Sequence, residues 1–534
     1  MIPMEEQLLG ASENGNIEEV KRLLNESNID LNYLNSELKR TPLSIACYNG
    51  HIEIVKLLLN DKRVEVYQAT NYQNQTPLFI ACQQGHIEVV KLLLNDQRVD
   101  VNKTNNEGKT SFYVACFEGY IEIVKLFLLN DQRVDVNKPR NDGVTPLCIA
   151  CYHGHIEIVK LLLNDQRVNI NQANNDGQTP FYMICNESWI ELVKLLLSNE
   201  RVDVNQTNND HRTPFYIACS KGHTEIVKIL LNSERIGVNK PDNHGITPLH
   251  TTCLFGHIKV IELLLNNERV EINKEENCIR ATPLYMASYE GQIEVVKLLL
   301  NNQRVDINKP TLNNQTAFYA ACLKGHIEIV KLFLRNDRVD VNKANKDEVT
   351  PLYVACSKRH IEVAKLLLND KRIWMDKFDG INRANKYGAT PFYVACEKGH
   401  IEVVNLLLND ERVEVNKAKN FGITPFYIAC ENGHLEVVKL LLASERDINI
   451  NKRAYFIFTA LGASMGRSSA TKKSNWETEE EFQIVKKNCP LIVEILQSYQ
   501  KNQKETQSRL RREVKYCIFL LFIFLSFLIT NNFF

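Results

Sequence analysis

The sequence lacks three features that would each identify a class of protein. Lys and Arg together number 64, and Asp and Glu together also number 64, so the formal net charge is zero. A nucleic-acid-binding protein normally carries a basic surplus, so this balance disfavours that class. The first ten residues, MIPMEEQLLG, contain no basic segment and no apolar core, and we expect no secretory signal. No phosphate-binding glycine loop, nucleophile elbow or set of paired carboxylates is present outside the repeated pattern described next.

One pattern fills most of the chain. The stretch Thr76–Asn102 reads TPLFIACQQGHIEVVKLLLNDQRVDVN and recurs every 34 or 35 residues, apart from one step of 40 residues between Thr350 and Thr390. Repetition at this period predicts a single solenoid of stacked units, because each unit alone cannot bury its apolar face. The copies begin at Thr41, Thr76, Thr110, Thr145, Thr179, Thr213, Thr247, Thr282, Thr316, Thr350, Thr390 and Thr424.

Local signals predict two short helices in each unit. Thr76 is suited to cap the first helix and Pro77 to occupy its first turn, and Gly85 is expected to end it in a left-handed conformation. A second helix is expected from about His86 to Leu94. We expect Asn95 to end the second helix with a left-handed cap, and we expect the same of Asn60, Asn164 and Asn409 in other units. Neither helix is long enough to be stable alone, so both depend on stacking.

These motifs resemble one known family. The order Thr-Pro-Leu, Ala, Gly-His, Val-Val-Lys-Leu-Leu-Leu and Val-Asn is similar to the ankyrin repeat, over about residues 4–461 in some thirteen or fourteen copies. The resemblance implies an all-α solenoid of paired antiparallel helices, with protruding hairpin-like fingers and a concave face that binds partners. The units depart from the family length of about 33 residues, and the extra residue lies in the Asn-Asp-Gln-Arg-Val stretch after the second helix.

The ends of the chain predict a division into five parts. These are an N-terminal capping repeat (4–40), twelve repeats (41–458), a degenerate C-terminal capping repeat with a polar insert (459–499), a polar and basic linker (500–515), and a hydrophobic tail (516–534). We expect a second helix at Leu491–Tyr499 in the closing repeat.

The tail leaves two alternatives open. Cys517–Ile529 is apolar apart from Ser526, and taken through to Phe534 the tail is about 18 residues long, close to the shortest helix that spans a bilayer. The basic segment RLRREVK before it favours a cytoplasmic orientation. A possible membrane anchor would therefore hold the repeats toward the cytosol. The other reading is a cytoplasmic protein whose tail is not an anchor, because similar apolar runs arise when AT-rich DNA beyond a true stop codon is translated.

Recurrent cysteines favour a packing role over chemistry. Eleven of the 15 cysteines occupy one position of the unit, and Cys82 is an example. Stacked units lie about 10 Å apart, which is too far for a disulfide between equivalent cysteines. We therefore expect small buried thiols in a reducing compartment. Cys148 and Cys151 form the one C-x-x-C pair, and no second pair completes a metal site. We expect no metal and no cofactor.

Four other recurrent residue types also have structural interpretations. Histidine occupies the turn between the helices in nine units, His86 among them, and follows Gly in eight of these; we expect it to hydrogen bond there. Tyrosine recurs eight times on the first helices, and packing between units is favoured over a contact surface. Pairs such as Glu53 and Lys56 predict ion pairs on an exposed helix face. A row of arginines, including Arg98, is expected to be neutralised by nearby carboxylates, with a binding stripe for acidic partners as the alternative.

Copies that deviate from the pattern offer candidate partner-binding residues. Trp189 replaces the usual His, Arg359 replaces the Gly before His360, and the long step contains Trp374 and Phe378. Aromatic residues on a protruding loop are plausible hot spots, although these could instead fold back and seal the local core. The resemblance and expected exposure add further candidates at the first-helix ends and on the fingers: Gln83, Gln84, Asn106, Glu107 and Lys109.

The sequence therefore predicts a non-enzymatic protein–protein interaction scaffold that binds partner proteins through the concave face and fingers. No catalytic residue and no small-molecule substrate are expected. The alternative is a tail-anchored membrane tether or adaptor that presents the solenoid to the cytosol. Nucleic-acid binding is a third hypothesis, and it would require a salt-sensitive affinity that the balanced charge does not predict.

Overall fold

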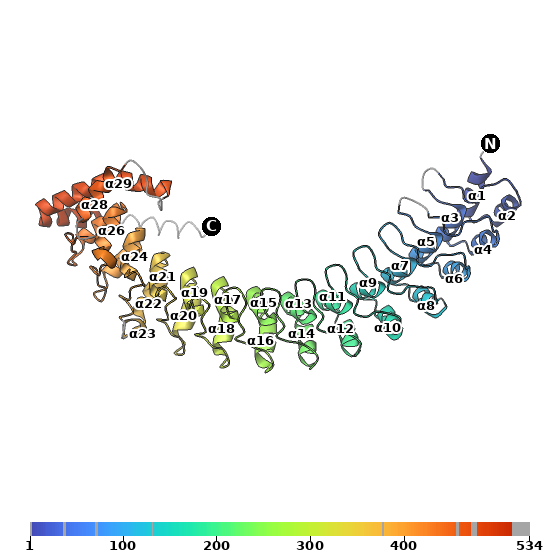
Figure 1. Cartoon of the computed structure of the whole chain (residues 1–534), viewed down its shortest axis with the longest axis horizontal. Helices are drawn as coiled ribbons and strands as arrows, with labels where there is room; N and C mark the ends of the chain where they lie inside the picture. Colours follow the sequence, from blue (N-terminus) through green and yellow to red (C-terminus); the bar gives the residue numbers. More distant parts are fainter. Residues whose placement is uncertain are drawn as a thin grey trace, which may run out of the picture. The chain divides into compact units, whose positions relative to one another are not determined.

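The chain is described by a computed structural model that covers residues 3–35, 39–69, 73–130, 132–375, 379–454, 459–470 and 478–514. These residues form helices and connecting loops, with no β-strand among them, so the all-α prediction is confirmed. Two compact units, Met1–Val270 (unit 1) and Glu271–Phe534 (unit 2), each consist of stacked helix pairs (Figure 1).

Unit 1 contains eight helix pairs, and in Figure 1 the first helices form one row and the second helices another. The first helices are α1 (Met4–Glu13), α3 (Pro42–Asn49), α5 (Pro77–Gln84), α7 (Ser111–Glu118), α9 (Pro146–Tyr152), α11 (Pro180–Glu187), α13 (Pro214–Lys221) and α15 (Pro248–Phe255). The second helices are α2 (Ile17–Leu24), α4 (Ile52–Asn60), α6 (Ile87–Asn95), α8 (Ile121–Asn130), α10 (Ile156–Asn164), α12 (Ile190–Leu197), α14 (Thr224–Leu231) and α16 (Ile258–Asn266).

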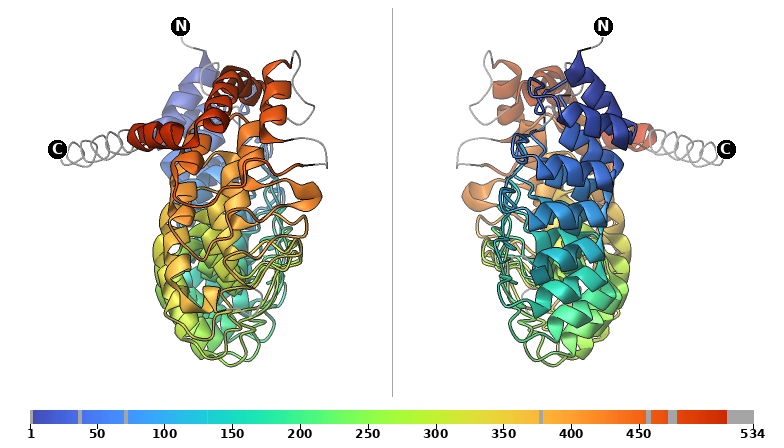
Figure 2. Two further views of the ribbon diagram at one scale, coloured as in Figure 1. Left: turned by 90° about the vertical axis from the view of Figure 1, so that its left-hand side faces the viewer. Right: turned by 90° about the vertical axis from the view of Figure 1, so that its right-hand side faces the viewer.

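Unit 2 repeats this arrangement, and in both units the loops that join one pair to the next project from one side of the helix rows (Figure 2). Its first helices are α17 (Pro283–Glu290), α19 (Ala317–Lys324), α21 (Pro351–Ser357), α24 (Pro391–Lys398), α26 (Pro425–Glu431) and α28 (Ala460–Ser468). Its second helices are α18 (Ile293–Asn301), α20 (Ile327–Leu334), α22 (Ile361–Asn369), α25 (Ile401–Leu408), α27 (Leu435–Ala443) and α29 (Glu479–Lys501). Two short elements, α23 (Lys371–Trp374) and η1 (Asn420–Gly422), lie in loops.

The predicted boundaries of the first helix are confirmed. The Thr76 hydroxyl accepts a hydrogen bond from the Phe79 N–H at 3.2 Å, and Pro77 occupies the first turn of α5. Gly85 ends the helix with φ of 78°, a left-handed conformation that glycine adopts without steric cost. The α6 helix begins directly afterwards, at Ile87.

The predicted left-handed cap of the second helix is wrong. Asn95 lies inside α6, which is followed by Asp96 with φ of −84°. Asn60 and Asn164 likewise end their helices, and Asn409 has φ of −79°. The reason lies in the next repeat: the Arg133 guanidinium donates to the carbonyl of Leu94 at 2.9 Å. A carbonyl at the helix end is thus satisfied from outside, and no left-handed residue is needed.

The core lies between the two helix layers and between successive pairs. The recurrent cysteines are fully buried and unpaired, as predicted, and burial raises the pKa of thiols such as Cys47 and Cys116. The recurrent tyrosines also pack inside: Tyr113 is completely buried and Tyr393 nearly so. Packing therefore explains both series, and neither forms a contact surface.

Polar side chains join each repeat to its neighbour within a unit. The His86 Nε2–H donates to the carbonyl of Tyr48 at 2.8 Å, so the predicted structural hydrogen bond is confirmed and reaches the preceding repeat. Asn102 donates to the carbonyl of Arg133 at 2.8 Å and accepts from the Asp135 N–H at 2.8 Å. Together with the arginines, these bonds satisfy backbone groups that would otherwise face the repeat interface.

The arginine row has this structural role rather than that of a binding stripe. Arg98 Nη2 donates to the carbonyl of Leu59 at 2.7 Å, and its guanidinium also pairs with Asp96 at 2.6 Å. Arg372 makes the equivalent bond to Leu334 at 2.7 Å and pairs with Asp370 at 2.7 Å. In these two repeats the carboxylate neutralises the guanidinium, as predicted, whereas Arg201 has Asn199 in place of the aspartate and still donates to the carbonyl of Leu163.

The C-terminal helices extend beyond the predicted ones. The α29 helix starts at a capping box between Thr478 and Glu481, well before the expected start at Leu491. Residues 503–514, expected to be a linker, are helical. Arg511 donates to the carbonyl of Ala443 at 2.9 Å, and Gln507 donates to that of Ser444 at 2.9 Å. These side chains replace the arginine that a following repeat would supply to α27.

The hydrophobic tail, residues 516–534, lies outside the described residues. Among the residues that are described, no helix combines the length and the apolar character that crossing a bilayer requires.

Candidate functional site

The fingers are the loops between a second helix and the next first helix, and their tips form a ladder of backbone hydrogen bonds. The Asn141 N–H donates to the carbonyl of Glu107 at 3.0 Å, and the Asn175 N–H donates to that of Asp142 at 2.9 Å. In unit 2 the Lys386 N–H donates to the carbonyl of Asp347 at 2.9 Å. Each tip is thereby fixed beside the next, and tip side chains add to the ladder, because Asn141 Nδ2 donates to the carbonyl of Asn106 at 3.0 Å.

A buried amide at the base of several fingers, among them Asn105 and Asn345, holds the tip in place. The Asn105 side chain is buried, and its Oδ1 accepts the N–H groups of Glu107 at 3.0 Å and Lys109 at 2.9 Å. Asn345 in unit 2 accepts equivalent bonds from Asp347 at 2.9 Å and Val349 at 3.0 Å. The tip conformation is therefore set by a residue that a partner cannot touch.

Finger tips and first-helix ends belong to one surface, which we call the finger face of each unit. In unit 1 the Lys109 ammonium lies 5.6 Å from the ring centre of Phe117, the residue before the end of α7. In unit 2 the Lys419 ammonium lies 4.0 Å from a carboxylate oxygen of Glu397, near the end of α24. Long finger side chains thus contact side chains at the helix ends.

Five of the predicted candidates lie on the finger face of unit 1. Gln84 is exposed at the end of α5, with Gln83 half-buried beside it. Asn106 and Glu107 are exposed at a finger tip, and Lys109 pairs with Glu107 at 2.7 Å. The next three tips each carry Asn followed by an acidic residue, namely Asp142, Asp176 and Asp210.

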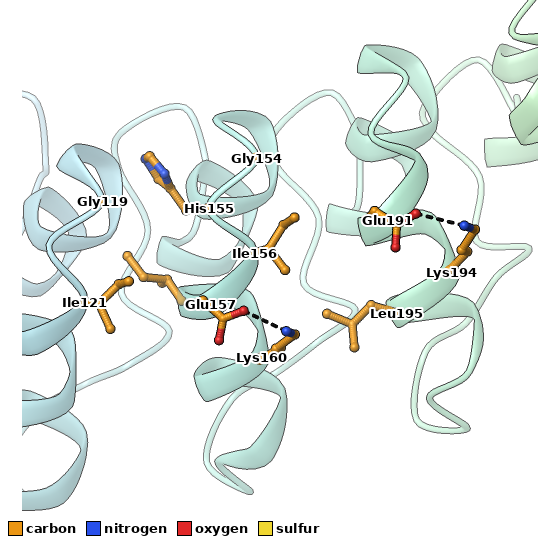
Figure 3. Close-up of a pocket in the computed structure, with 11 residues that line it drawn as sticks. Gly119, Ile121, Gly154, His155, Ile156, Glu157, Lys160, Glu191, Lys194 and Leu195 are labelled. Carbon is orange, nitrogen blue, oxygen red and sulfur yellow. Dashed lines mark hydrogen bonds and ion pairs between the residues drawn. The ribbon is translucent and has the colours of Figure 1, made fainter.

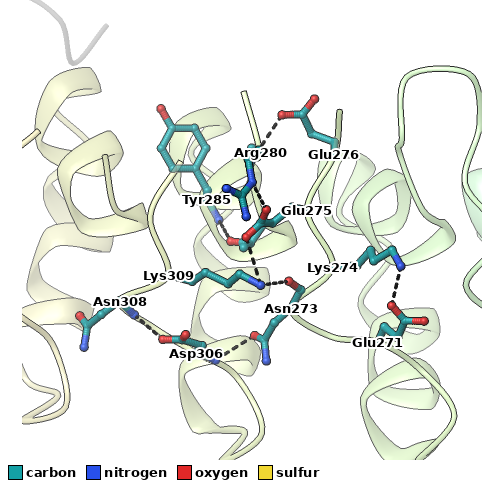
Figure 4. Close-up of polar contacts among 12 residues, drawn as sticks. Glu271, Asn273, Lys274, Glu275, Glu276, Arg280, Tyr285, Asp306, Asn308 and Lys309 are labelled. Carbon is teal, nitrogen blue, oxygen red and sulfur yellow. Dashed lines mark hydrogen bonds and ion pairs between the residues drawn. The ribbon is translucent and has the colours of Figure 1, made fainter. Parts of the chain in front are cut away.

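The first finger of unit 2 is built differently (Figure 4). Glu276 replaces the basal amide and accepts three N–H groups, those of Cys278 at 2.6 Å, Ile279 at 2.8 Å and Ala281 at 2.9 Å. Burial acts to raise the pKa of Glu276, but these N–H groups outweigh it and lower the pKa. Beside it, Glu275 pairs with Arg280 and, at 3.2 Å, with Lys309. The finger presents Ile279, which is 49% exposed.

The finger face of unit 2 is apolar at several tips and basic at the helix ends. Leu312, whose N–H donates to the carbonyl of Ile279 at 2.7 Å, is 46% exposed, and Tyr387 and Phe421 are 53% and 66% exposed. An exposed lysine stands at the end of three consecutive first helices: Lys324 and Lys398 are the last residues of α19 and α24, and Lys358 directly follows α21.

Trp189 and Arg359 lie at turns between helices instead. The indole N–H of Trp189 donates to the carbonyl of Tyr152 at 3.0 Å, the bond that histidine makes in other repeats. A Cβ atom at Gly154 would come within 2.8 Å of this ring, so the two residues are closely packed. Arg359 replaces glycine with φ of 61° and pairs with Glu402 of the next repeat at 2.7 Å. Both side chains join neighbouring repeats.

Trp374 ends the short helix α23, away from the finger tips. It is 44% exposed, and the Arg412 guanidinium lies 5.5 Å from its ring centre. Its neighbour Met375 is more exposed. Phe378, predicted to act with Trp374, lies outside the described residues.

The second helices of unit 1 form a groove of about 710 Å³, with lining residues from α8, α10 and α12 (Figure 3). Its charged side chains pair within each helix: Glu157 with Lys160 at 2.6 Å, and Glu191 with Lys194 at 2.8 Å. This confirms the predicted ion pairs of the second helices. Within the described part of the chain, no group of three or more His, Cys, Asp or Glu side chains could hold a metal ion.

The residues that sequence reasoning missed share two positions of the repeat. Lys324, Lys358 and Lys398 each directly precede the turn that ends a first helix, and Tyr387 and Phe421 each follow the tip residue whose N–H joins the ladder. Aligning the repeats and comparing only these positions would have found them, because the variation there is chemical and the backbone is constant.

Comparison with known proteins agrees with this architecture. No curated protein matches the chain. A family model described as ankyrin repeats (3 copies) matches six overlapping stretches: 8–105, 97–174, 164–242, 235–311, 284–379 and 371–454. Repeats of this family are generally protein–protein interaction modules. Since these matches span residues 8–454 without a gap, the chain belongs to the ankyrin-repeat family.

Proposed function

We propose that the chain is a non-enzymatic scaffold that binds partner proteins through the finger faces of its two units. The observation that carries this proposal is the ladder of finger tips. The backbone at each tip is fixed by its neighbour and by a buried side chain such as Asn105. The exposed side chains differ from tip to tip.

Rigid tips favour binding for a thermodynamic reason. A partner that docks on a mobile loop must order it, at an entropic cost that a fixed loop avoids. The tips are ordered before a partner arrives, so contact energy is not lost in immobilising them. The same ladder places the tips of the repeats that it joins in equivalent positions, and a long partner could contact several in sequence.

The polar groups of the molecule support binding more than catalysis. His86 is held by a carbonyl, and the thiol of Cys82 is buried, with a pKa that burial raises. On the finger face of unit 1, Glu107 pairs with Lys109 and Asp210 lies 3.4 Å from Arg212. These groups have partners within their own finger and are suited to recognition.

Affinity capture by the full chain tests the proposal. We expect specific proteins to be enriched by mass spectrometry, and a variant with Gln84→Ala, Asn106→Ala and Glu107→Ala to lose those bound by unit 1. Lys160→Ala, in the groove between second helices, is the matched control and should retain them. The proposal fails if the intact chain enriches no protein over empty beads, or if the control loses as much as the finger variant.

Trp374 and Phe378 are proposed as additional partner contacts. The exposure of Trp374 and Met375 beside α23 supports this. Replacing Trp374 and Phe378 by Ala should weaken capture while the thermal melt stays nearly unchanged. Trp189→His is the matched control, because it replaces a tryptophan by the residue that makes the same hydrogen bond elsewhere. A large drop in melting temperature with unaltered capture would instead assign Trp374 and Phe378 to the local core.

A second proposal, attachment to a membrane, rests on the sequence of residues 516–534 alone. The apolar run follows the basic segment 509–515, which suits a cytoplasmic flank. Fractionation of cells that express the chain with and without residues 516–534 tests it. Recovery of both forms in the soluble fraction would exclude the anchor.

A further inference from the structure

We propose that the finger face of unit 2 binds an extended acidic segment of a partner protein, with carboxylates at about every third residue. The inference deepens the scaffold function proposed above and rests on it. The surface concerned comprises Lys324, Lys358 and Lys398 at three consecutive first-helix ends, together with the finger tips beside them. We call it the lysine face.

The three lysines are available for a partner. All three are exposed. Among the described residues no carboxylate lies within 4.0 Å of the Lys358 or Lys398 ammonium, and Lys398 acts on Glu481 only through its charge, which helps to lower the pKa of that carboxyl. Lys324 lies 4.1 Å from the ring centre of Tyr289, a contact that positions its ammonium without neutralising it. Lys346, at a neighbouring finger tip, is exposed and likewise forms no ion pair with any described residue.

The helix dipole does not account for this row. A lysine at the C-terminal end of a helix is favoured by the dipole, by an amount that solvent and salt reduce. At the same positions in unit 1, α7 ends in Glu118 and α11 ends in Glu187. Since the fold tolerates the opposite charge there, stability does not require the three lysines of unit 2.

The spacing of the repeats determines the expected pattern in the partner. Packed helices lie about 8–10 Å apart, and an extended chain advances about 3.3 Å per residue. A partner segment that runs along the stack therefore passes one lysine for roughly every three residues. The residues between the carboxylates would reach the exposed rings of Tyr387 and Phe421, which suit apolar side chains.

Carboxylates on the same face favour a peptide over a nucleic acid. Asp347 pairs with Lys386 at 2.6 Å, Glu397 lies 4.0 Å from Lys419, and Glu348 is exposed beside Lys346. A phosphate backbone carries a charge at every nucleotide and would be repelled at these points. A peptide can place neutral residues there and reserve its acids for the lysines.

The test uses the full chain and a fluorescent peptide of about twelve residues, with Glu at every third position and Leu or Ser between. The triple variant Lys324→Ala, Lys358→Ala, Lys398→Ala should bind it about tenfold more weakly in fluorescence anisotropy, because three charge contacts are lost. Lys221→Ala, at the equivalent position of α13 in unit 1, is the matched control and should bind normally. The triple Lys→Arg variant should retain binding, and raised salt should weaken it.

Several outcomes would overturn the lysine face. One is unchanged peptide affinity in the triple Ala variant with a normal circular dichroism spectrum. Another is a loss of peptide affinity in Lys221→Ala equal to that of the triple variant. A third is tighter binding of a single-stranded oligonucleotide than of the peptide. A same-composition peptide with its Glu residues clustered should bind more weakly, and equal binding would refute the spacing. Failure here leaves the scaffold function intact if affinity capture still enriches proteins, whereas capture of no protein would refute the scaffold itself.

Discussion

Finger tips of unit 1 and unit 2 occupy the same place in the repeat and carry different chemistry. Four consecutive tips in unit 1 pair Asn with an acid, as in Asn106 and Glu107, and two of the neighbouring first helices end in Glu118 and Glu187, while α13 ends in Lys221. In unit 2 the tips include Ile279, Tyr387 and Phe421, and lysine stands at the ends of α19, α21 and α24, while α17 ends in Glu290. The buried contacts beneath are equivalent in both units. Interior residues therefore specify the fold, and the surface positions are free to specify partners.

The largest loss of stability is expected for substitutions of core leucines, and it tests whether the cores of unit 1 and unit 2 are packed equivalently. Leu230 of α14 and Leu299 of α18 are both fully buried at the same position of the repeat. Leu230→Ala and Leu299→Ala should each cost about 2–5 kcal/mol of unfolding free energy, because each leaves a cavity. Urea unfolding, followed by circular dichroism and analysed with a nearest-neighbour model, measures both. A difference above about 2 kcal/mol would show that the units are packed differently.

An intermediate effect is expected for the arginines that join repeats. Arg98→Lys in unit 1 and Arg372→Lys in unit 2 remove the planar fork that binds a carbonyl and a carboxylate together. Each should cost about 1–2 kcal/mol, the range for losing hydrogen bonds to a charged group. Lys91→Ala, on an exposed helix face, is the control in the same denaturation assay. Costs no larger than that of the control would mean that water replaces the arginine bonds without penalty.

A small effect is expected for Asp165→Asn at neutral pH. Arg167 holds the pKa of Asp165 below its usual value of 3.8. A lowered folded-state pKa contributes stability above the unfolded value, and this stability is lost as the pH falls through the folded value. The variant should therefore show a shallower loss of stability below about pH 4, and a change of less than about 1 kcal/mol at pH 7. Asn199 Oδ1 accepts the backbone N–H of Arg201 at 2.9 Å, as Asp165 Oδ1 accepts that of Arg167 at 2.9 Å, so the fold accommodates the amide.

Much of the fold could be predicted because its signals are local and repeated. Thr76 and Gly85 mark helix ends through their own backbone preferences, and the period of the pattern gives the stacking. The left-handed cap at Asn95 failed because the relevant contact comes from Arg133 in the following repeat. A prediction that treats each repeat alone cannot include a bond between repeats.

Part of the candidate site could also be predicted from the repeat pattern. Asn106 and Glu107 lie on the exposed finger face, where the repeat pattern places them. Trp189 was chosen because it deviates from the pattern, yet its indole N–H makes the hydrogen bond of the histidine that it replaces. A residue that departs from the repeat pattern indicates a partner contact only where its side chain no longer makes the contact with the neighbouring repeat that the usual residue makes.

The bonds between repeats also bear on how such a chain can change its copy number. Arg98 reaches back to Leu59 and Arg372 reaches back to Leu334, so each repeat brings the donors that complete the one before it. A duplicated repeat arrives with both its donors and its acceptors, and it can be inserted or deleted without redesign of its neighbours. After α27 comes the irregular pair α28 and α29 instead of a further regular repeat, and there Arg511 supplies the donor to Ala443. Gene duplication can lengthen the scaffold at any internal position as long as this closing segment is kept.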